Sequence, residues 1–92
     1  EGVDAAFVGP ADLSQTYGLP GQPNDPKILA GLERFIKVCQ EHNVVPGIHV
    51  YDPDSFKKWY DAGMRLFAYR NDISMLADTA AQCVADVKGM LK

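Results

Sequence analysis

The sequence predicts an α/β fold in which three parallel strands are each followed by a helix. Three short apolar runs with β-branched or aromatic residues, at positions 5–9, 44–50 and 64–70, are typical of buried strands. Apolar residues recur every three or four positions after each run, which indicates helices with one apolar face. Because crossovers between such strands are right-handed, we expect the three strands to be parallel in one sheet.

The first strand is expected to end at Gly9, because Pro10 has no backbone N–H to donate to a neighbouring strand. Asp12 then lies just beyond the carboxyl end of the strand, where α/β proteins bind their ligands. Two roles fit this carboxylate. It either caps a short helical turn by accepting from an amide two or three residues later, or it serves as a cation ligand or catalytic carboxylate.

Residues 15–26 hold two glycines and three prolines, so we expect a loop. The loop is long for a connection between a strand and a helix, and it serves either as a rigid spacer or as part of a site. Asp25 and Pro26 then supply a cap and a first helical residue. The helix ends at Asn43, and its apolar face consists of Ile28, Leu32, Phe35, Ile36 and Cys39.

His49 lies near the carboxyl end of the second strand and either packs structurally or faces a site. Asp52 and Pro53 repeat the helix-start pattern, and Gly63 is expected to end that helix. The aromatic residues of this helix, at helical spacing, predict core packing rather than a binding platform.

Asp72 is expected to cap the last helix, which runs over residues 73–91. A stripe of apolar residues along it predicts packing against another helix or a neighbouring subunit: Ile73, Leu76, Ala77, Ala80, Ala81, Val84 and Val87. Cys39 and Cys83 both fall on apolar helical stripes. We expect two buried free thiols, as in a reducing cytoplasm, and no metal site through them.

The chain has 92 residues, enough for one small domain over residues 1–92, and a formal net charge of -3. This charge disfavours a nucleic-acid binder, which would show a concentrated basic surface. No apolar run approaches the ~20 residues of a membrane span. Because the first residue is Glu1, we expect the chain to be the carboxyl-terminal part of a longer protein.

The segment Phe7-Val8-Gly9-Pro10-Ala11-Asp12-Leu13-Ser14 resembles the metal-binding segment of the HpcH/HpaI-type class II pyruvate aldolases. The resemblance continues through Gly18, Pro26, Pro46-Gly47-Ile48 and the last helix, so it covers nearly the whole chain. It implies a TIM (β/α)8 barrel, of which these residues would form the last three βα units. It also implies the cleavage of a 4-hydroxy-2-oxo acid to pyruvate and an aldehyde, in a cytoplasmic oligomer.

The resemblance further implies that Asp12 binds a divalent metal ion, Mg2+, Mn2+ or Co2+. The backbone amides of Ala11 and Asp12, after Gly9, would then hold the carboxylate of a small 2-oxo acid, and Leu13 would form an apolar wall. The family's glutamate ligand, catalytic histidine and substrate-binding arginine lie on earlier strands. We therefore expect no catalytic residue in this segment, which would need the amino-terminal part of the barrel as its partner.

The clearest departure from the family pattern is at Tyr69, Arg70 and Asn71, where the family usually has a valine, a glycine and a small residue. Arg70 either binds an acidic end of the substrate or forms an ion pair at the rim. Two other functions stay open for the chain. One is a related malyl- or citramalyl-type lyase, and the other is an inactive segment that only promotes oligomerisation.

Overall fold

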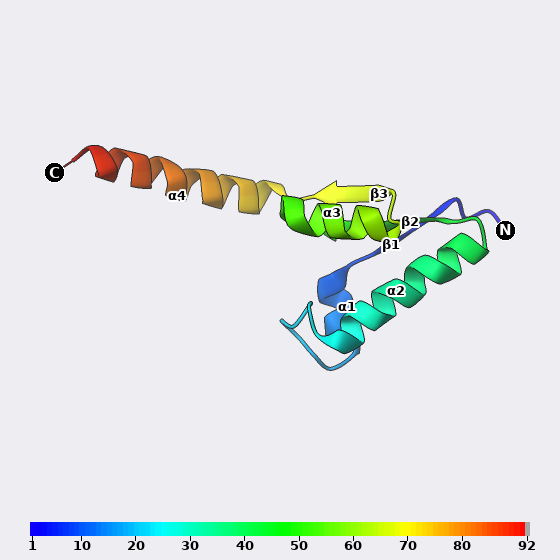
Figure 1. The fold of residues 1–92 in the computed structure, drawn as a ribbon. Coiled ribbons are helices and arrows are strands. Elements are labelled where there is room, and N and C mark those ends of the chain that lie inside the picture. Colours follow the sequence, from blue (N-terminus) through cyan, green and yellow to red (C-terminus); the bar gives the residue numbers. More distant parts are fainter. Residues whose placement is uncertain (92) are drawn as a thin grey trace.

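A computed structural model describes residues 1–91 and shows a three-stranded parallel sheet with four helices (Figure 1). The fold class is therefore the α/β class predicted from the sequence. The elements are β1 (Ala5–Val8), α1 (Pro10–Thr16), α2 (Pro26–Glu41), β2 (Val45–Val50), α3 (Pro53–Ala62), β3 (Leu66–Tyr69) and α4 (Asp72–Met90).

The strands lie in the order β1-β2-β3, and both neighbouring pairs are parallel. The register aligns Phe7 with Gly47 and Gly47 with Leu66, so these three side-chain positions share one face of the sheet. Ile48 pairs with Val8 and Phe67 and belongs to the opposite face.

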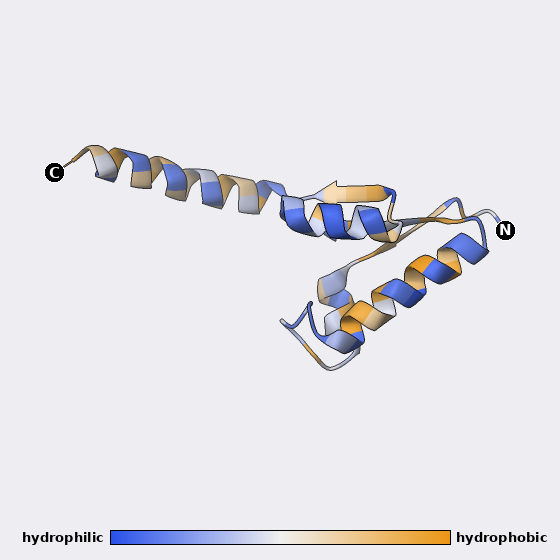
Figure 2. Ribbon diagram, in the orientation of Figure 1, coloured by the Kyte–Doolittle hydropathy of each residue, from blue (hydrophilic) through white to orange (hydrophobic). Residues whose placement is uncertain are grey.

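Helices α2 and α3 cover the face that contains Ile48, and the hydrophobic core forms there. The core joins one face of α2, two residues of β2, one residue of α3 and one residue after it: Ile28, Leu32, Ile36, Ile48, Val50, Trp59 and Met64. Of the aromatic residues of α3 that were predicted to pack in the core, only Trp59 is buried, whereas Phe56 and Tyr60 are exposed. The alternation of apolar and polar residues along α2 is visible in Figure 2. Apolar burial on this single face holds the helices on the sheet.

No helix within residues 1–91 covers the other face of the sheet. Phe7, Val45 and Leu66 lie on this face and are 49%, 42% and 45% exposed. The sequence predicts a barrel-interior face that includes some of Phe7, Ile48 and Phe67 or their neighbours, and of these three only Phe7 lies on the open face. Ile48 is fully buried beneath the helices, and Phe67 packs on Phe56 of α3 with ring centroids 4.6 Å apart. Successive side chains of a strand point to opposite faces of the sheet, so at this register Ile48 and Phe67 lie on the face opposite to Phe7.

The predicted caps of two helices are confirmed. The Asp25 carboxylate accepts a 2.9 Å hydrogen bond from the Lys27 amide, and the Asp52 carboxylate accepts one of 2.8 Å from the Ser55 amide. The predicted cap of α4 is wrong by one residue. Asn71 is the cap, and its side chain accepts from the Ser74 amide at 2.7 Å, whereas Asp72 already belongs to the helix.

Helix α4 extends away from the sheet and has no buried residue (Figure 1). It gives the molecule a long axis, with extents of 60 × 27 × 22 Å. The expectation that Cys83 is buried is therefore wrong, because α4 has no buried residue, whereas Cys39 on α2 is buried as predicted. Among residues 1–91, no helix combines the length and the apolarity that crossing a membrane requires.

Candidate functional site at the carboxyl end of the first strand

Asp12 lies in the first turn of α1, directly beyond the carboxyl end of β1. The helix begins at Pro10 with Gly9 at its cap position, and no side chain caps it. The alternative in which Asp12 is the cap is therefore wrong. Proline at the first helical position starts the helix two residues earlier than Asp12. The carboxylate of Asp12 is exposed and forms no hydrogen bond or ion pair with the residues that the structure describes.

Gly9 makes room for this carboxylate. A Cβ atom at Gly9 would lie 2.9 Å from Oδ2 of Asp12, which is closer than real Cβ contacts allow. The Asp12 side chain thus lies close to the Gly9 backbone at the end of β1 while it stays exposed to solvent. A side chain at position 9 would displace an oxygen that is otherwise free to bind a cation.

Two backbone amides next to this carboxylate precede the helical hydrogen bonds of α1. The first such bond runs from the Leu13 amide to the Gly9 carbonyl, at 2.9 Å. The amides of Ala11 and Asp12 therefore lie before it and have no helical acceptor. Leu13 is half-buried and packs against the hydrophobic core, and its role as a wall of the site stays a prediction.

Ser14 supports this turn and was not singled out in the sequence. Its side chain is almost fully buried, at 1% exposure, and its hydroxyl donates a 2.6 Å hydrogen bond to the carbonyl of Ala11. This hydrogen bond restrains the first turn of α1 on its buried side. The sequence signal that could have indicated this role is the serine directly after Asp12-Leu13 in the motif.

His49 projects from the open face near the end of β2. Its Nε2 donates to the carbonyl of Arg70 at 2.7 Å, and its ring stacks on Tyr51 with centroids 4.6 Å apart. Because a carbonyl oxygen only accepts, Nε2 must hold a proton. The packing role is thus the one that the structure gives to His49, and it joins the end of β2 to the turn after β3.

Arg70 lies in that turn with a positive φ of 60°, in the left-handed region. Its guanidinium forms an ion pair with Asp78 on α4 and also donates to the Ser74 carbonyl. Of its two expected roles, the structure shows the rim ion pair. The left-handed backbone also explains why a glycine suits this position in the resembled family.

The site is incomplete within residues 1–91. No three potential metal-binding side chains among histidine, cysteine, aspartate and glutamate come together there. Asp12 and its neighbour therefore supply one carboxylate and two amides, whereas His49 is bonded to the Arg70 carbonyl and the Arg70 guanidinium to α4. The Asp12 carboxylate can bind a cation, and the two neighbouring amides can bind an anionic group beside it.

Comparisons with known proteins agree with the resemblance read from the motif. The chain is 35% identical over 85 residues to a 4-hydroxy-2-oxo-heptane-1,7-dioate aldolase of Escherichia coli. It is 38% identical over 88 residues to a hydroxypyruvate/pyruvate aldolase of Roseobacter denitrificans. These alignments cover 92% and 96% of the chain but 32% and 34% of the relatives.

The fold gives the same result. A crystal structure of an HpcH/HpaI aldolase/citrate lyase family protein from Burkholderia cenocepacia superposes with a TM-score of 0.89 and 31% identity. The match covers 95% of this chain and 34% of that one. The chain thus spans about a third of the length of its relatives, which are TIM-barrel aldolases. No protein-family model matches it.

Proposed function

The chain is a homologue of the HpcH/HpaI aldolases over nearly its whole length, and from this premise we propose that it forms part of a carbon–carbon lyase. The proposed reaction is the metal-dependent, reversible cleavage of a 4-hydroxy-2-oxo acid to pyruvate and an aldehyde. The observation that carries the proposal is the unpaired carboxylate of Asp12 beside two free amides at the end of β1.

The residues present fit a divalent metal ion such as Mg2+, Mn2+ or Co2+. Asp12 offers a hard oxygen donor, and Gly9 leaves the space in which that donor sits. When bound, such an ion is a Lewis acid that stabilises the negative charge developing on the pyruvate half. A second protein ligand would come from outside residues 1–92, since those described contain no further donor cluster.

The substrate carboxylate is proposed to bind at the start of α1. The amides of Ala11 and Asp12 point out of the first turn, where unpaired N–H groups favour an anion. Ser14 holds the Ala11 carbonyl and so keeps these amides in place. Gly9 lets a small 2-oxo acid approach the backbone closely. Residues 1–92 supply no general base in this proposal, so the proton transfers belong to other parts of the protein.

Residues 1–92 are proposed to be one partial barrel domain that lacks activity alone. The remaining barrel would supply the other ligands and cover the open face of the sheet. The unpacked apolar stripe of α4, with Ile73 and Leu76 76% and 74% exposed, supports packing against another subunit. An inactive segment with only that oligomerising role is the alternative from a different functional class.

The test uses the intact protein that contains this chain. We expect it to release pyruvate from 4-hydroxy-2-oxo acids only when a divalent metal is present, which a coupled pyruvate assay measures. A malyl- or citramalyl-type lyase would instead cleave the corresponding malyl or citramalyl thioester and release a thioester product. Metal-independent pyruvate release would contradict the proposed role of Asp12, and no cleavage of either substrate class would favour the oligomerising segment.

A further inference from the structure

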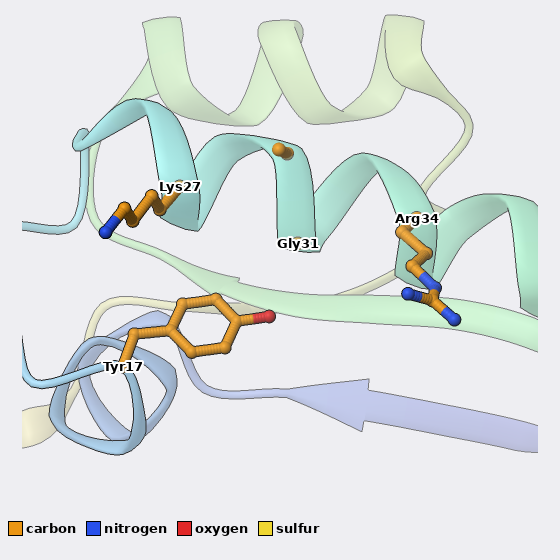
Figure 3. Close-up of a pocket in the computed structure, with 5 residues that line it drawn as sticks. Tyr17, Lys27, Gly31 and Arg34 are labelled. Atoms are coloured by element: carbon orange, nitrogen blue, oxygen red, sulfur yellow. The ribbon is translucent and has the colours of Figure 1, made fainter.

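A groove lies on the outer side of the molecule, between the end of α1 and the first half of α2. It is a shallow, open groove of about 490 Å³, and its lining residues are Tyr17, Lys27, Ala30, Gly31 and Arg34. Figure 3 shows the Tyr17 ring lying alongside α2, with Lys27 toward one end of it and Arg34 toward the other. Asp12 is not among the lining residues, so this groove is separate from the candidate metal site.

The groove is built from two elements in a specific way. Lys27, Gly31 and Arg34 lie at spacings of four and three along α2, which places them on one helix face. Tyr17 ends α1 and reaches over Gly31. A Cβ atom at Gly31 would lie 2.9 Å from the Tyr17 hydroxyl oxygen, so the absence of a side chain there gives the hydroxyl its place.

The polar groups around the groove are donors without acidic partners. Neither Lys27 nor Arg34 forms an ion pair with the described part of the chain, and the Tyr17 hydroxyl has no hydrogen bond there. Asp25 lies two residues before Lys27, but its carboxylate caps the helix through the Lys27 amide. Two cations and one phenol hydroxyl thus border a groove that no carboxylate lines.

We propose that this groove binds a small phosphate-bearing molecule through Lys27, Arg34 and the Tyr17 hydroxyl. An arginine fork and a lysine ammonium are the side chains that best match phosphate oxygens. The two cations start about 10 Å apart along the helix axis, and Figure 3 shows their charged groups toward opposite ends of the Tyr17 ring, so both long side chains must turn toward the hydroxyl to hold one phosphate between them. The volume also leaves room for the rest of a small ligand.

The experiment titrates inorganic phosphate into the intact protein and follows heat or chemical shifts. We expect saturable binding that weakens about tenfold to a hundredfold in Lys27→Gln and Arg34→Gln, since each loses a charged hydrogen-bonding partner. Lys37→Gln, an exposed lysine elsewhere on α2, is the matched control and should bind as the parent does. Asp12→Asn should also leave phosphate binding unchanged, which separates this site from the candidate metal site.

Gly31→Ala provides a test that a loss of folding cannot imitate. The new methyl group pushes the Tyr17 hydroxyl out of its place, while alanine favours the helix over glycine by about 1 kcal/mol. We expect weaker phosphate binding without a lower melting temperature. No saturable binding, equal weakening by Lys37→Gln, or tighter binding of malonate than of phosphate would each overturn the proposal.

Discussion

The carboxylate of Asp12 stands unpaired at the end of β1, in space that Gly9 leaves for it. In the intact protein, we expect Asp12→Asn to lose most lyase activity and to bind Mg2+ or Mn2+ more weakly, because the amide is a poorer and neutral donor for a hard cation. Activity measured against metal concentration, with a direct metal titration, checks this. Full activity of the variant at limiting metal would refute the role of Asp12 as a ligand.

Arg70 combines two opposing effects at one position. Its left-handed backbone, with φ of 60°, is costly for a residue with a Cβ, whereas its ion pair with Asp78 is exposed on one side and worth little. We expect Arg70→Gly to be about 1 kcal/mol more stable than Arg70→Ala, since only glycine is free of the strain. Unfolding of the two variants of the intact protein, compared side by side, measures this. Equal stabilities would show that the turn relaxes.

The residues of the candidate site were predictable only in part. The position of Asp12 after a strand that stops at Pro10 follows from the sequence. The engagement of His49 with the Arg70 carbonyl does not, because the two residues lie on neighbouring strands and meet only through the sheet register. The groove beneath Tyr17 was missed for the same reason, since it depends on how α1 packs on α2.

At the scale of single elements, local signals set most helix boundaries. Asp25 and Asp52, each before a proline, start their helices as predicted. The same proline rule starts α1 at Pro10, although glycine is a weaker cap signal than aspartate. Asn71 and Asp72 are both good caps, and Ser74 decides between them by completing a reciprocal pair of hydrogen bonds with Asn71.

The cap of α3 makes a prediction about acid stability. The Ser55 amide, and then the Ser55 hydroxyl, donate to Asp52 and hold the pKa of its carboxyl below the ordinary value. A lowered pKa in the folded state stabilises the protein above the unfolded pKa of about 4, and this contribution is lost as the pH falls through the folded value. The loss therefore occurs at the acid end, below about pH 4.

We expect Asp52→Ala to melt at a lower temperature than the parent protein at pH 7, and this difference to shrink in acid. Asp52→Asn is the matched control, because asparagine keeps a cap but does not titrate. Its melting temperature should approach that of the parent as the pH falls below about 4. A difference between the parent and Asp52→Ala that is the same at pH 7 and in strong acid would contradict the role of the ionised cap.

Helix α4 shows that the pattern within one element does not predict what that element packs against. The three- and four-residue spacing of its apolar residues predicts a helix with an apolar stripe, and the helix forms over Asp72–Met90. Burial of that stripe, including the expected burial of Cys83, requires a surface that residues 1–91 do not provide. Periodicity indicates which side of a helix is apolar, but the partner that covers this side is a property of the assembled protein.

The molecule as a whole is a sheet with one covered face and one open face. The core uses only the covered face, between β2 and helices α2 and α3. On the open face, the Phe7 ring lies over Gly47, where a Cβ would come within 3.0 Å of the ring, and Leu66 lies on the other side. The chain spans about a third of its relatives, so these contacts are proposed to be the inner wall of a larger barrel.

That arrangement predicts how the chain behaves by itself. Full burial of a large apolar side chain contributes about 1.5–3 kcal/mol, so the roughly half-exposed Phe7, Val45 and Leu66 together forgo a substantial part of the marginal stability of a small domain. The edge strands β1 and β3 also present unpaired backbone groups that recruit other chains. We expect a polypeptide restricted to residues 1–92 to associate, to bind an apolar dye strongly and to show no lyase turnover. The intact protein is the control and should bind little dye. Sedimentation at low micromolar concentration decides the question, because a cooperative monomer with little dye binding would mean that the three βα units close a core of their own.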